Sequence, residues 1–112
     1  MEIEENKDGI ISILSLKGKL DAYSSRDLEN SIKKVIEGGC NNILVNFQGV
    51  DYISSSGLRV ILSSLKQIKK LDGQIKLANL KPHVLEVFEI SGFTQIFDIY
   101  EGQEEALKSF NS

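Results

Sequence analysis

The chain has 112 residues, of which 41% are hydrophobic and 26% are charged, and its formal net charge is −3. This length suits one domain with one core, so we expect a single domain over residues 1–112. The acidic balance gives no electrostatic support for nucleic-acid binding. No apolar run approaches the roughly 20 residues of a membrane span, and the acidic start lacks the features of a signal peptide. With Cys40 as its single cysteine, the chain cannot form an internal disulfide, which is typical of a cytoplasmic protein.

The first quarter of the chain predicts a hairpin. Residues 2–7 are expected to form a short edge strand, and Asp8-Gly9 is a strong hairpin-turn signal. Residues 10–16 are rich in apolar residues and predict the second strand. The polar and glycine-containing residues 17–21 are expected to form the loop that follows it.

The next segment predicts a helix and then a strand. Ser24 or Ser25 is placed to cap the helix, because serine side chains accept hydrogen bonds from free N–H groups at helix starts. Apolar residues follow at i, i+4, i+7 and i+8, namely Leu28, Ile32, Val35 and Ile36. The helix is expected to end at Gly38 and Gly39. Residues 43–47 alternate and predict a strand.

The second half of the chain repeats this strand–helix order. A helix after residue 56 is expected to stop at Asp72-Gly73, and the strict alternation of residues 74–78 predicts a strand. Pro82 suits the first turn of a further helix, which should bury Leu85 and Phe88, with Val84 beside them. Residues 96–100 predict a short strand and residues 101–110 a final helix.

The alternation of strands and helices predicts an α/β fold with a mixed sheet. Strands separated by helices pair in parallel with right-handed crossovers, and the hairpin adds an antiparallel strand. A parallel strand buried on both faces is apolar throughout, whereas Gln74 and Lys76 share one face of their strand. We therefore expect helices mainly on one side of the sheet, with Gln74 and Lys76 on the more exposed side.

Residues 51–58, Asp-Tyr-Ile-Ser-Ser-Ser-Gly-Leu, stand between an apolar strand and a helix. The first N–H groups of a helix are free, and the helix dipole favours negative charge there. One serine is enough for a cap, so two of Ser54, Ser55 and Ser56 remain to be explained. Ser56 is the best placed of the three as cap or first-turn residue.

No motif of a catalytic or metal site is present. The single histidine, His83, has no second ligand at metal-binding spacing. We therefore expect it to be a surface or capping residue. The nucleophile elbow G-x-S-x-G and the phosphate-loop patterns are absent. Cys40 follows two glycines in a turn, and this position favours a packing or incidental residue over a reactive one. Asp21 and Asp51 stand at strand ends, where aspartate commonly bonds its own backbone.

Three stretches resemble motifs of the anti-sigma factor antagonists, the stand-alone STAS domains of bacterial partner switching. Residues 18–23, Gly-Lys-Leu-Asp-Ala-Tyr, resemble the family's G-E-[LI]-D loop, and residues 51–58 resemble its [FY]-[MI]-D-S-[ST]-G-L loop. Residues 85–97 resemble its L-F-x-[IL]-[ST]-G-[LF]-x-x-[IL]-[IF] segment. The resemblance covers residues 10–110 and implies the STAS-like strand–helix superhelix, with about five strands and helices mainly on one face.

The resemblance also implies a function in bacterial signalling and the regulation of transcription. In that family, the unphosphorylated antagonist binds an anti-sigma factor that is also a serine kinase, which releases the sigma factor. Phosphorylation by this kinase ends the binding, and a PP2C-type phosphatase restores it. Such a protein is no enzyme, needs no cofactor or metal, contacts neither nucleic acid nor membrane, and is a monomer when free. The alternative is a STAS scaffold or accessory subunit of a transport or signalling complex, without phosphorylation.

Alignment on Ser-Gly-Leu places the family's phosphorylated serine at Ser55, with Ser54 as the second choice. Ser54 stands where the family has aspartate, so the acidic neighbour is absent and the register is open by one residue. Asp21 is expected near residues 54–56, because parallel strands bring their carboxyl ends to one edge. The implied partner-binding residues are Asp21, Tyr23, Asp51, Ser54, Ser55, Ser56 and Gly57.

Overall fold

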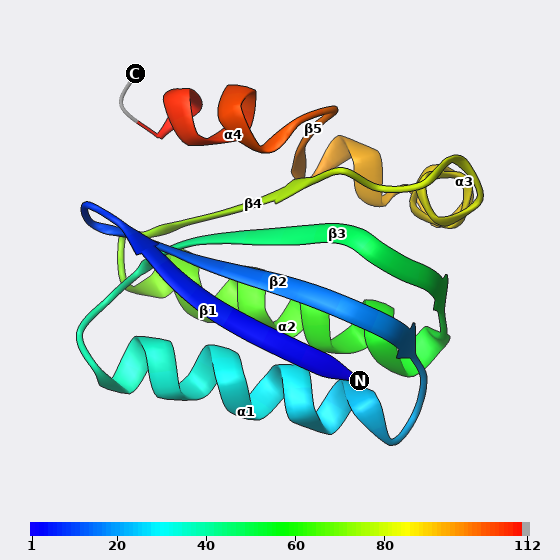
Figure 1. Cartoon of the computed structure of the whole chain (residues 1–112), viewed down its shortest axis with the longest axis horizontal. Helices are drawn as coiled ribbons and strands as arrows, with labels where there is room; N and C mark the ends of the chain where they lie inside the picture. Colours follow the sequence, from blue (N-terminus) through cyan, green and yellow to red (C-terminus); the bar gives the residue numbers. More distant parts are fainter. Residues whose placement is uncertain (111–112) are drawn as a thin grey trace.

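The computed structural model describes residues 1–110 and contains a five-stranded mixed sheet between helices (Figure 1). The strands are β1 (Glu2–Asp8), β2 (Ile11–Leu20), β3 (Asn42–Ile53), β4 (Gln74–Ala78) and β5 (Asp98–Tyr100). The helices are α1 (Ser24–Glu37), α2 (Ser55–Lys70), α3 (Pro82–Ile90), the 3-10 helix η1 (Phe93–Gln95) and α4 (Gln103–Ser109). Within residues 1–110, no helix is both long and apolar enough to cross a membrane.

The strands lie in the sheet in chain order, β1-β2-β3-β4-β5. β1 pairs antiparallel with β2, and the remaining neighbours pair in parallel. Right-handed crossovers between sequential parallel strands place their helices on the same face. α1 and α2 accordingly lie side by side beneath the sheet, and α3 lies at one end (Figure 1). The expectation of a mixed sheet with helices mainly on one face is confirmed.

The main core fills the space between the sheet and helices α1, α2 and α3. Alternate residues of each strand point into it, as for Ile43, Val45 and Phe47 of β3, which are fully buried. Helix α3 contributes Val84 and Phe88, whereas Leu85 is only half-buried, so its predicted burial is wrong. Phe88 points into this core from a helix that begins at Pro82, as the sequence predicts.

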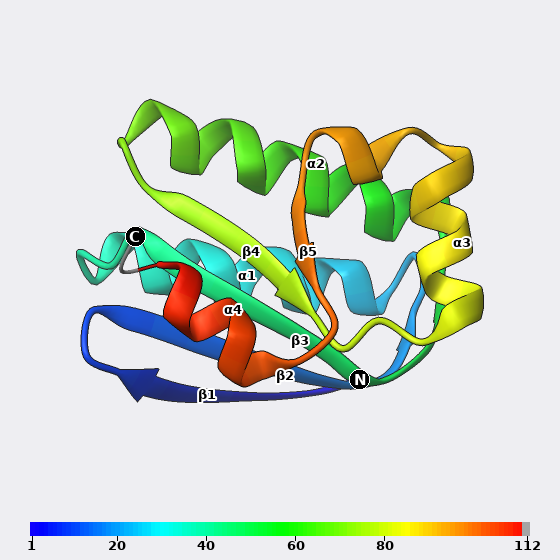
Figure 2. The same ribbon diagram turned by 90° about the horizontal axis from the view of Figure 1, so that it is seen from above.

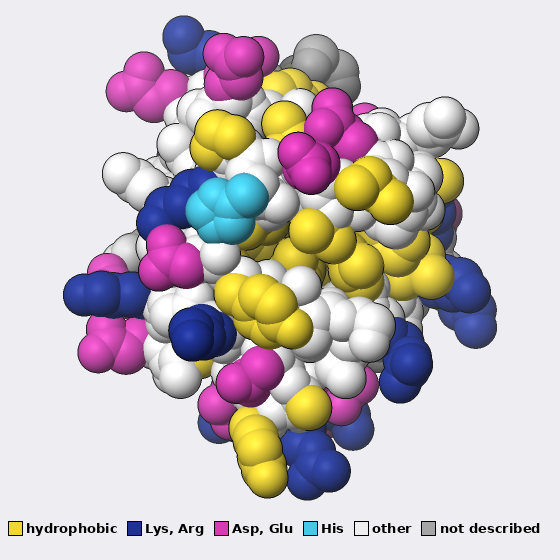
Figure 3. Space-filling model, turned by 90° about the vertical axis from the view of Figure 1, so that its right-hand side faces the viewer, with side chains coloured by type: hydrophobic (Ala, Val, Ile, Leu, Met, Phe, Trp, Pro, Cys, Tyr) yellow, Lys and Arg dark blue, Asp and Glu magenta, His cyan; other side chains and the backbone are white. Residues whose placement is uncertain are grey.

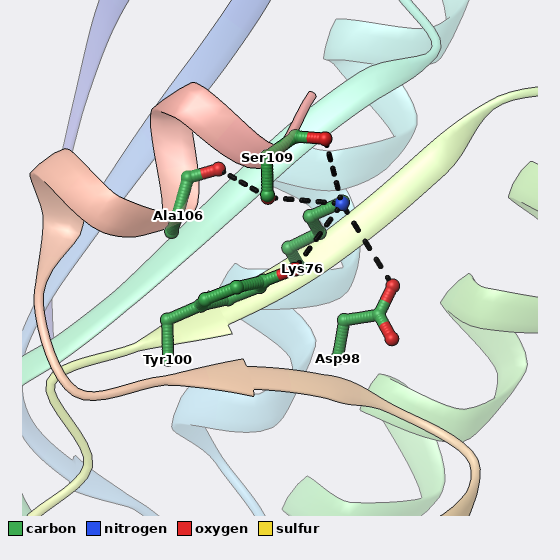
Figure 4. A network of polar contacts seen from close by, with 5 residues as sticks. All are labelled: Lys76, Asp98, Tyr100, Ala106 and Ser109. Atoms are coloured by element: carbon green, nitrogen blue, oxygen red, sulfur yellow. Dashed lines mark hydrogen bonds and ion pairs between the residues drawn. The ribbon is translucent and has the colours of Figure 1, made fainter. Parts of the chain in front are cut away.

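The prediction for Lys76 is wrong, because α4 returns across the second face of the sheet (Figures 1 and 2). Lys76 is only 6% exposed and lies beneath this helix, whereas Gln74 is exposed. The Lys76 ammonium donates to Ser109 Oγ at 2.9 Å and to Ser109 O at 3.3 Å (Figure 4). It also lies over the rings of Tyr100 and Phe110. A buried lysine is tolerated here because its ammonium contacts the end of a helix and two aromatic rings in place of the water that would otherwise solvate it.

This second face carries its own small core. Its buried apolar residues come from β2, β3, β4, α4 and the residue that follows α4, and they are Ile11, Ile13, Leu44, Ala78, Ala106 and Phe110. Lys76 pairs with Leu44 in the parallel register and so lies among them. Strict alternation therefore reports the direction of a side chain correctly, but it does not report what covers that face.

The predicted loop at residues 17–21 is wrong for most of its length, since β2 continues to Leu20. The β2–β3 register shifts between Ser15 and Lys17 and again between Gly18 and Lys19. Irregularities of this kind let polar and glycine residues stay in a ladder. β3 is longer than predicted as well, so that Leu20 pairs with Ile53 at the far end of both strands.

Candidate partner-binding surface

The carboxyl ends of β2 and β3 meet at one end of the molecule (Figure 1). The Ser54 N–H donates to the Leu20 carbonyl at 2.9 Å, which joins the segment after β3 to the segment after β2. Asp21 directly follows Leu20, so it lies beside the serine segment as the sequence predicts. Hydrophobic side chains are mixed with charged ones at this end of the molecule (Figure 3).

Asp21 organises the start of α1. Its Oδ1 accepts from the N–H groups of Tyr23 and Ser24, each at 3.0 Å, and from Ser24 Oγ at 3.1 Å. The predicted serine cap is wrong, since Tyr23 holds the cap position and both Ser24 and Ser25 are buried in the first turn. The hydrogen bonds from Ser24 and Tyr23 lower the pKa of Asp21. Turn chemistry is therefore one role of this carboxylate.

The three serines of residues 54–56 have different environments. Ser54 caps α2, because its Oγ accepts from the Gly57 N–H at 3.1 Å. Ser56 is the second residue of the helix and half-buried, so it is a first-turn residue, which is one of the two positions expected for it. Ser55 is the first residue of α2 and is exposed. Its hydroxyl thus lies where α2 favours negative charge, with no acidic residue in the first turn.

Gly57 has a packing role at this position. A Cβ atom placed on it would lie 2.9 Å from both Ile53 Cγ1 and Leu20 Cγ, closer than side chains tolerate. Gly57 itself is buried. The absence of a side chain therefore lets the first turn of α2 approach the ends of β2 and β3.

Asp51 connects β3 to the start of α3. Its carboxylate forms an ion pair with Lys81, which lowers the pKa of Asp51 through a hydrogen bond and through charge. His83 Nε2 lies 2.6 Å from the Asp51 carbonyl oxygen, so this nitrogen carries the proton and donates. Lys81 and His83 were not predicted as site residues, because they stand 30 and 32 positions after Asp51.

Two tyrosines flank these loops and are open to solvent. Tyr23 is 86% exposed and Tyr52 is 50% exposed. Large exposed aromatic side chains are common anchors of protein–protein interfaces. Tyr52 was not predicted as a site residue, although its place between Asp51 and the buried Ile53 already indicates an outward direction.

These features make this end of the molecule a candidate surface for binding another protein. No three His, Cys, Asp or Glu side chains of residues 1–110 gather closely enough to hold a metal ion. His83 is exposed, which agrees with the predicted surface position, and its side chain bonds the Asp51 carbonyl of β3 and does not cap α3. This end of the molecule carries the exposed Ser55, two exposed tyrosines, and an aspartate that is paired with a lysine.

A family model for the STAS domain matches residues 2–106. The chain therefore belongs to the STAS domain family. It is 38% identical over 105 residues to BtrV of Bordetella bronchiseptica, which is named as a candidate anti-sigma factor antagonist. That alignment covers 94% of this chain and 90% of BtrV. It is 29% identical over 99 residues to the anti-sigma-B factor antagonist of Bacillus subtilis, covering 88% of each.

Solved structures show the same fold. A crystal structure of a candidate anti-sigma factor antagonist from Thermotoga maritima matches with a TM-score of 0.93 and 22% identity, covering 98% of this chain and 95% of that one. SpoIIAA of Bacillus in its phosphorylated form matches with a TM-score of 0.76 and 23% identity, covering 96% and 98%. Anti-sigma factor antagonists of the STAS family are non-enzymatic regulatory binding proteins.

Proposed function

We propose that this protein is an anti-sigma factor antagonist that works by partner switching. In its unphosphorylated state it binds an anti-sigma factor and so releases a sigma factor. The anti-sigma factor acts as the serine kinase for Ser55, and phosphorylation ends the binding. A PP2C-type phosphatase removes the phosphate. The names of the relatives from Bordetella and Bacillus, at 38% and 29% identity, support the antagonist role.

The observation that carries the choice of Ser55 is its exposure at the first position of α2. The Ser54 hydroxyl already holds the cap, which favours Ser55 as the free acceptor. The proposed partner surface comprises Asp21, Tyr23, Asp51, Tyr52 and residues 54–57. Gly57 contributes to it by packing, since it is buried.

The physical basis of the switch is the charge of the phosphate. A phosphoserine adds about −1.5 to −2 charges and three acceptor oxygens. At the start of α2 the free N–H groups tolerate these oxygens, so the fold need not change. Within a partner interface, the same charge must be desolvated without a matching cation, which is costly. Phosphorylation then lowers affinity without unfolding the protein.

The test is phosphorylation of the purified chain by its candidate anti-sigma factor kinases with ATP, followed by mass spectrometry of the modified residue. Wild type is expected to accept one phosphate at Ser55. Ser55→Ala should block it and keep partner binding, while Ser55→Asp should weaken binding. Ser63→Ala is the matched control, since Ser63 is another exposed serine on α2. Full phosphorylation of Ser55→Ala would move the site to Ser54, and no phosphate on any serine would favour the scaffold role.

A further inference from the structure

A groove beside β5 lies apart from the surface around Ser55. It is a cavity of about 500 Å³ between β5, η1 and the start of α3. In the view of Figure 2, β5 runs with β4 on one side and α3 on the other. The lining residues are mostly apolar and comprise Leu80, Leu85, Thr94, Phe97, Asp98, Ile99, Tyr100 and Glu101. None of them belongs to the proposed partner surface.

β5 is the last strand of the sheet, and no strand within residues 1–110 pairs with its outer side. The Tyr100 carbonyl accepts from the Asn79 N–H at 3.2 Å, which directs the Tyr100 backbone toward β4. Successive residues of a parallel strand face opposite sides, so Ile99 directs its N–H and C=O to the outer side. Backbone groups on an open edge can pair with an added strand.

The opposite edge of the sheet is protected against such pairing. β1 carries Glu2, Glu4, Glu5, Lys7 and Asp8, and nearly all of this strand is exposed and charged. Charged side chains on an edge strand discourage the addition of another strand. β5 lacks a comparable row, since two of its three residues are Ile99 and Tyr100. The open edge at β5 is therefore the one suited to binding.

The charges at the groove point to a basic occupant. Asp98 and Glu101 are both exposed, and none of the lining residues is a cation. Asp98 lies 3.9 Å from the Lys76 ammonium, but its side chain is 67% exposed and keeps an accessible oxygen (Figure 4). A lysine or arginine of a partner would find two carboxylates next to apolar surface.

We propose that this groove binds an extended segment of a partner protein that adds a strand to β5. Side chains of a strand alternate between its two faces. One set, apolar, enters the groove against Leu85 and Phe97, and the other set, basic, reaches Asp98 and Glu101. The cavity volume lies in the range of about 300–1,000 Å³ typical of ligand sites. The proposal does not depend on phosphorylation of Ser55.

The test is a titration of the ¹⁵N-labelled full chain by NMR with the capped heptapeptide Lys-Val-Lys-Val-Lys-Val-Lys. We expect saturable amide shifts confined to residues 80–85 and 94–101, and no such shifts with the same peptide carrying glutamate for lysine. Equal shifts with both peptides would overturn the charge argument. Shifts at β5 that grow with protein concentration alone would show that a second copy of the chain pairs there, which would overturn the proposal.

Variants separate backbone pairing from charge. Ile99→Pro removes the outward N–H without removing a hydrogen bond to β4, and it should weaken peptide binding about tenfold or more.

Thr94→Arg changes an exposed lining residue and should weaken binding of the basic peptide by adding a positive charge to the groove. Glu101→Gln should weaken binding severalfold and reduce its salt dependence. Glu104→Gln is the matched control, because Glu104 is exposed in α4 but does not line the groove. Unchanged affinity in Thr94→Arg and Glu101→Gln would refute the site.

Discussion

Asp21 has an observed structural role and a proposed binding role, and two substitutions can separate them. Its carboxylate accepts three hydrogen bonds that hold the start of α1, and it lies in the proposed partner surface. Asp21→Ala removes the acceptor and should lower the melting temperature. Asp21→Asn keeps a side-chain oxygen and loses only the charge, so it should leave the fold more stable than Asp21→Ala does. Weaker partner binding by Asp21→Asn, measured by calorimetry, would identify a direct role of the charge.

The lowered pKa of Asp21 predicts the direction of its pH dependence. A carboxylate whose pKa is lower in the folded chain stabilises the fold above its unfolded pKa, which is 3.8 for an ordinary aspartate. This contribution is lost as the pH falls through the lower folded pKa. The stability difference between wild type and Asp21→Asn should therefore be constant near neutral pH and shrink below about pH 4. Urea unfolding at several pH values measures it, and a difference that grows in acid contradicts the assignment.

Arg59 stands one helical turn after Ser55 on α2. It is exposed, and it takes part in no ion pair within the described part of the chain. Residues four positions apart lie on the same helix face, so a phosphate on Ser55 can attract this guanidinium. Phosphorylation should raise the free energy of unfolding by about 0.5–1 kcal/mol.

The contribution of Arg59 can be measured by denaturant unfolding of both phosphorylation states. Arg59→Gln should reduce the gain from phosphorylation, whereas Lys66→Gln, which also removes an exposed cation from α2, should leave it intact. An equal gain in wild type and Arg59→Gln would show that the helix start alone accommodates the phosphate.

At the scale of elements, α4 is held to the sheet by a polar contact within an apolar layer. Lys76 lies beneath this helix, and its only acidic neighbour at salt-bridge distance among the described residues is Asp98, which is largely exposed. Removing Lys76 therefore leaves no buried carboxylate unpaired. Lys76→Met fills a similar volume without a charge to desolvate, so stability should be unchanged or rise by about 1 kcal/mol.

A matched substitution distinguishes packing from charge at this position. Lys76→Ala leaves a cavity between β4 and α4 and should cost about 2 kcal/mol or more. Chemical unfolding of the two variants measures both effects. A large loss in Lys76→Met would show that the hydrogen bonds to Ser109, and not the packing, hold α4 in place.

For the whole molecule, we predict that stability and partner binding depend on different aromatic residues. Phe88 is fully buried and makes edge-to-face contacts with Phe47, Phe93 and Phe97, with ring centroids 6.0, 5.9 and 6.4 Å away. Phe88→Ala should cost about 3–5 kcal/mol of unfolding free energy. Tyr23→Ala should change stability by less than about 0.5 kcal/mol, yet weaken partner binding about tenfold. Similar stability losses in both variants would contradict this separation.

The amino-acid sequence by itself determined the order of the elements and the place of the serine segment. The signals for these elements lie within a few neighbouring residues, and they are the apolar periodicity, the Asp8-Gly9 turn and Pro82. Such signals act on the local backbone conformation and its hydrogen bonds. The exposure of Ser55 at a helix start follows from the same local logic. The alternation of Gln74 and Lys76 on one face is likewise correct as a direction.

The tertiary structure alone decided what surrounds those residues. Lys76 is buried because α4 returns across the second face, and no pattern near Lys76 encodes that path. β2 extends through residues 17–20 because β3 offers it a partner, which outweighs the loop propensity of its glycine and lysines. Asp51 meets Lys81 and His83 across more than 29 positions of sequence. Contacts between residues far apart in the sequence depend on how the helices and strands pack together. Periodicity indicates only which way each side chain points.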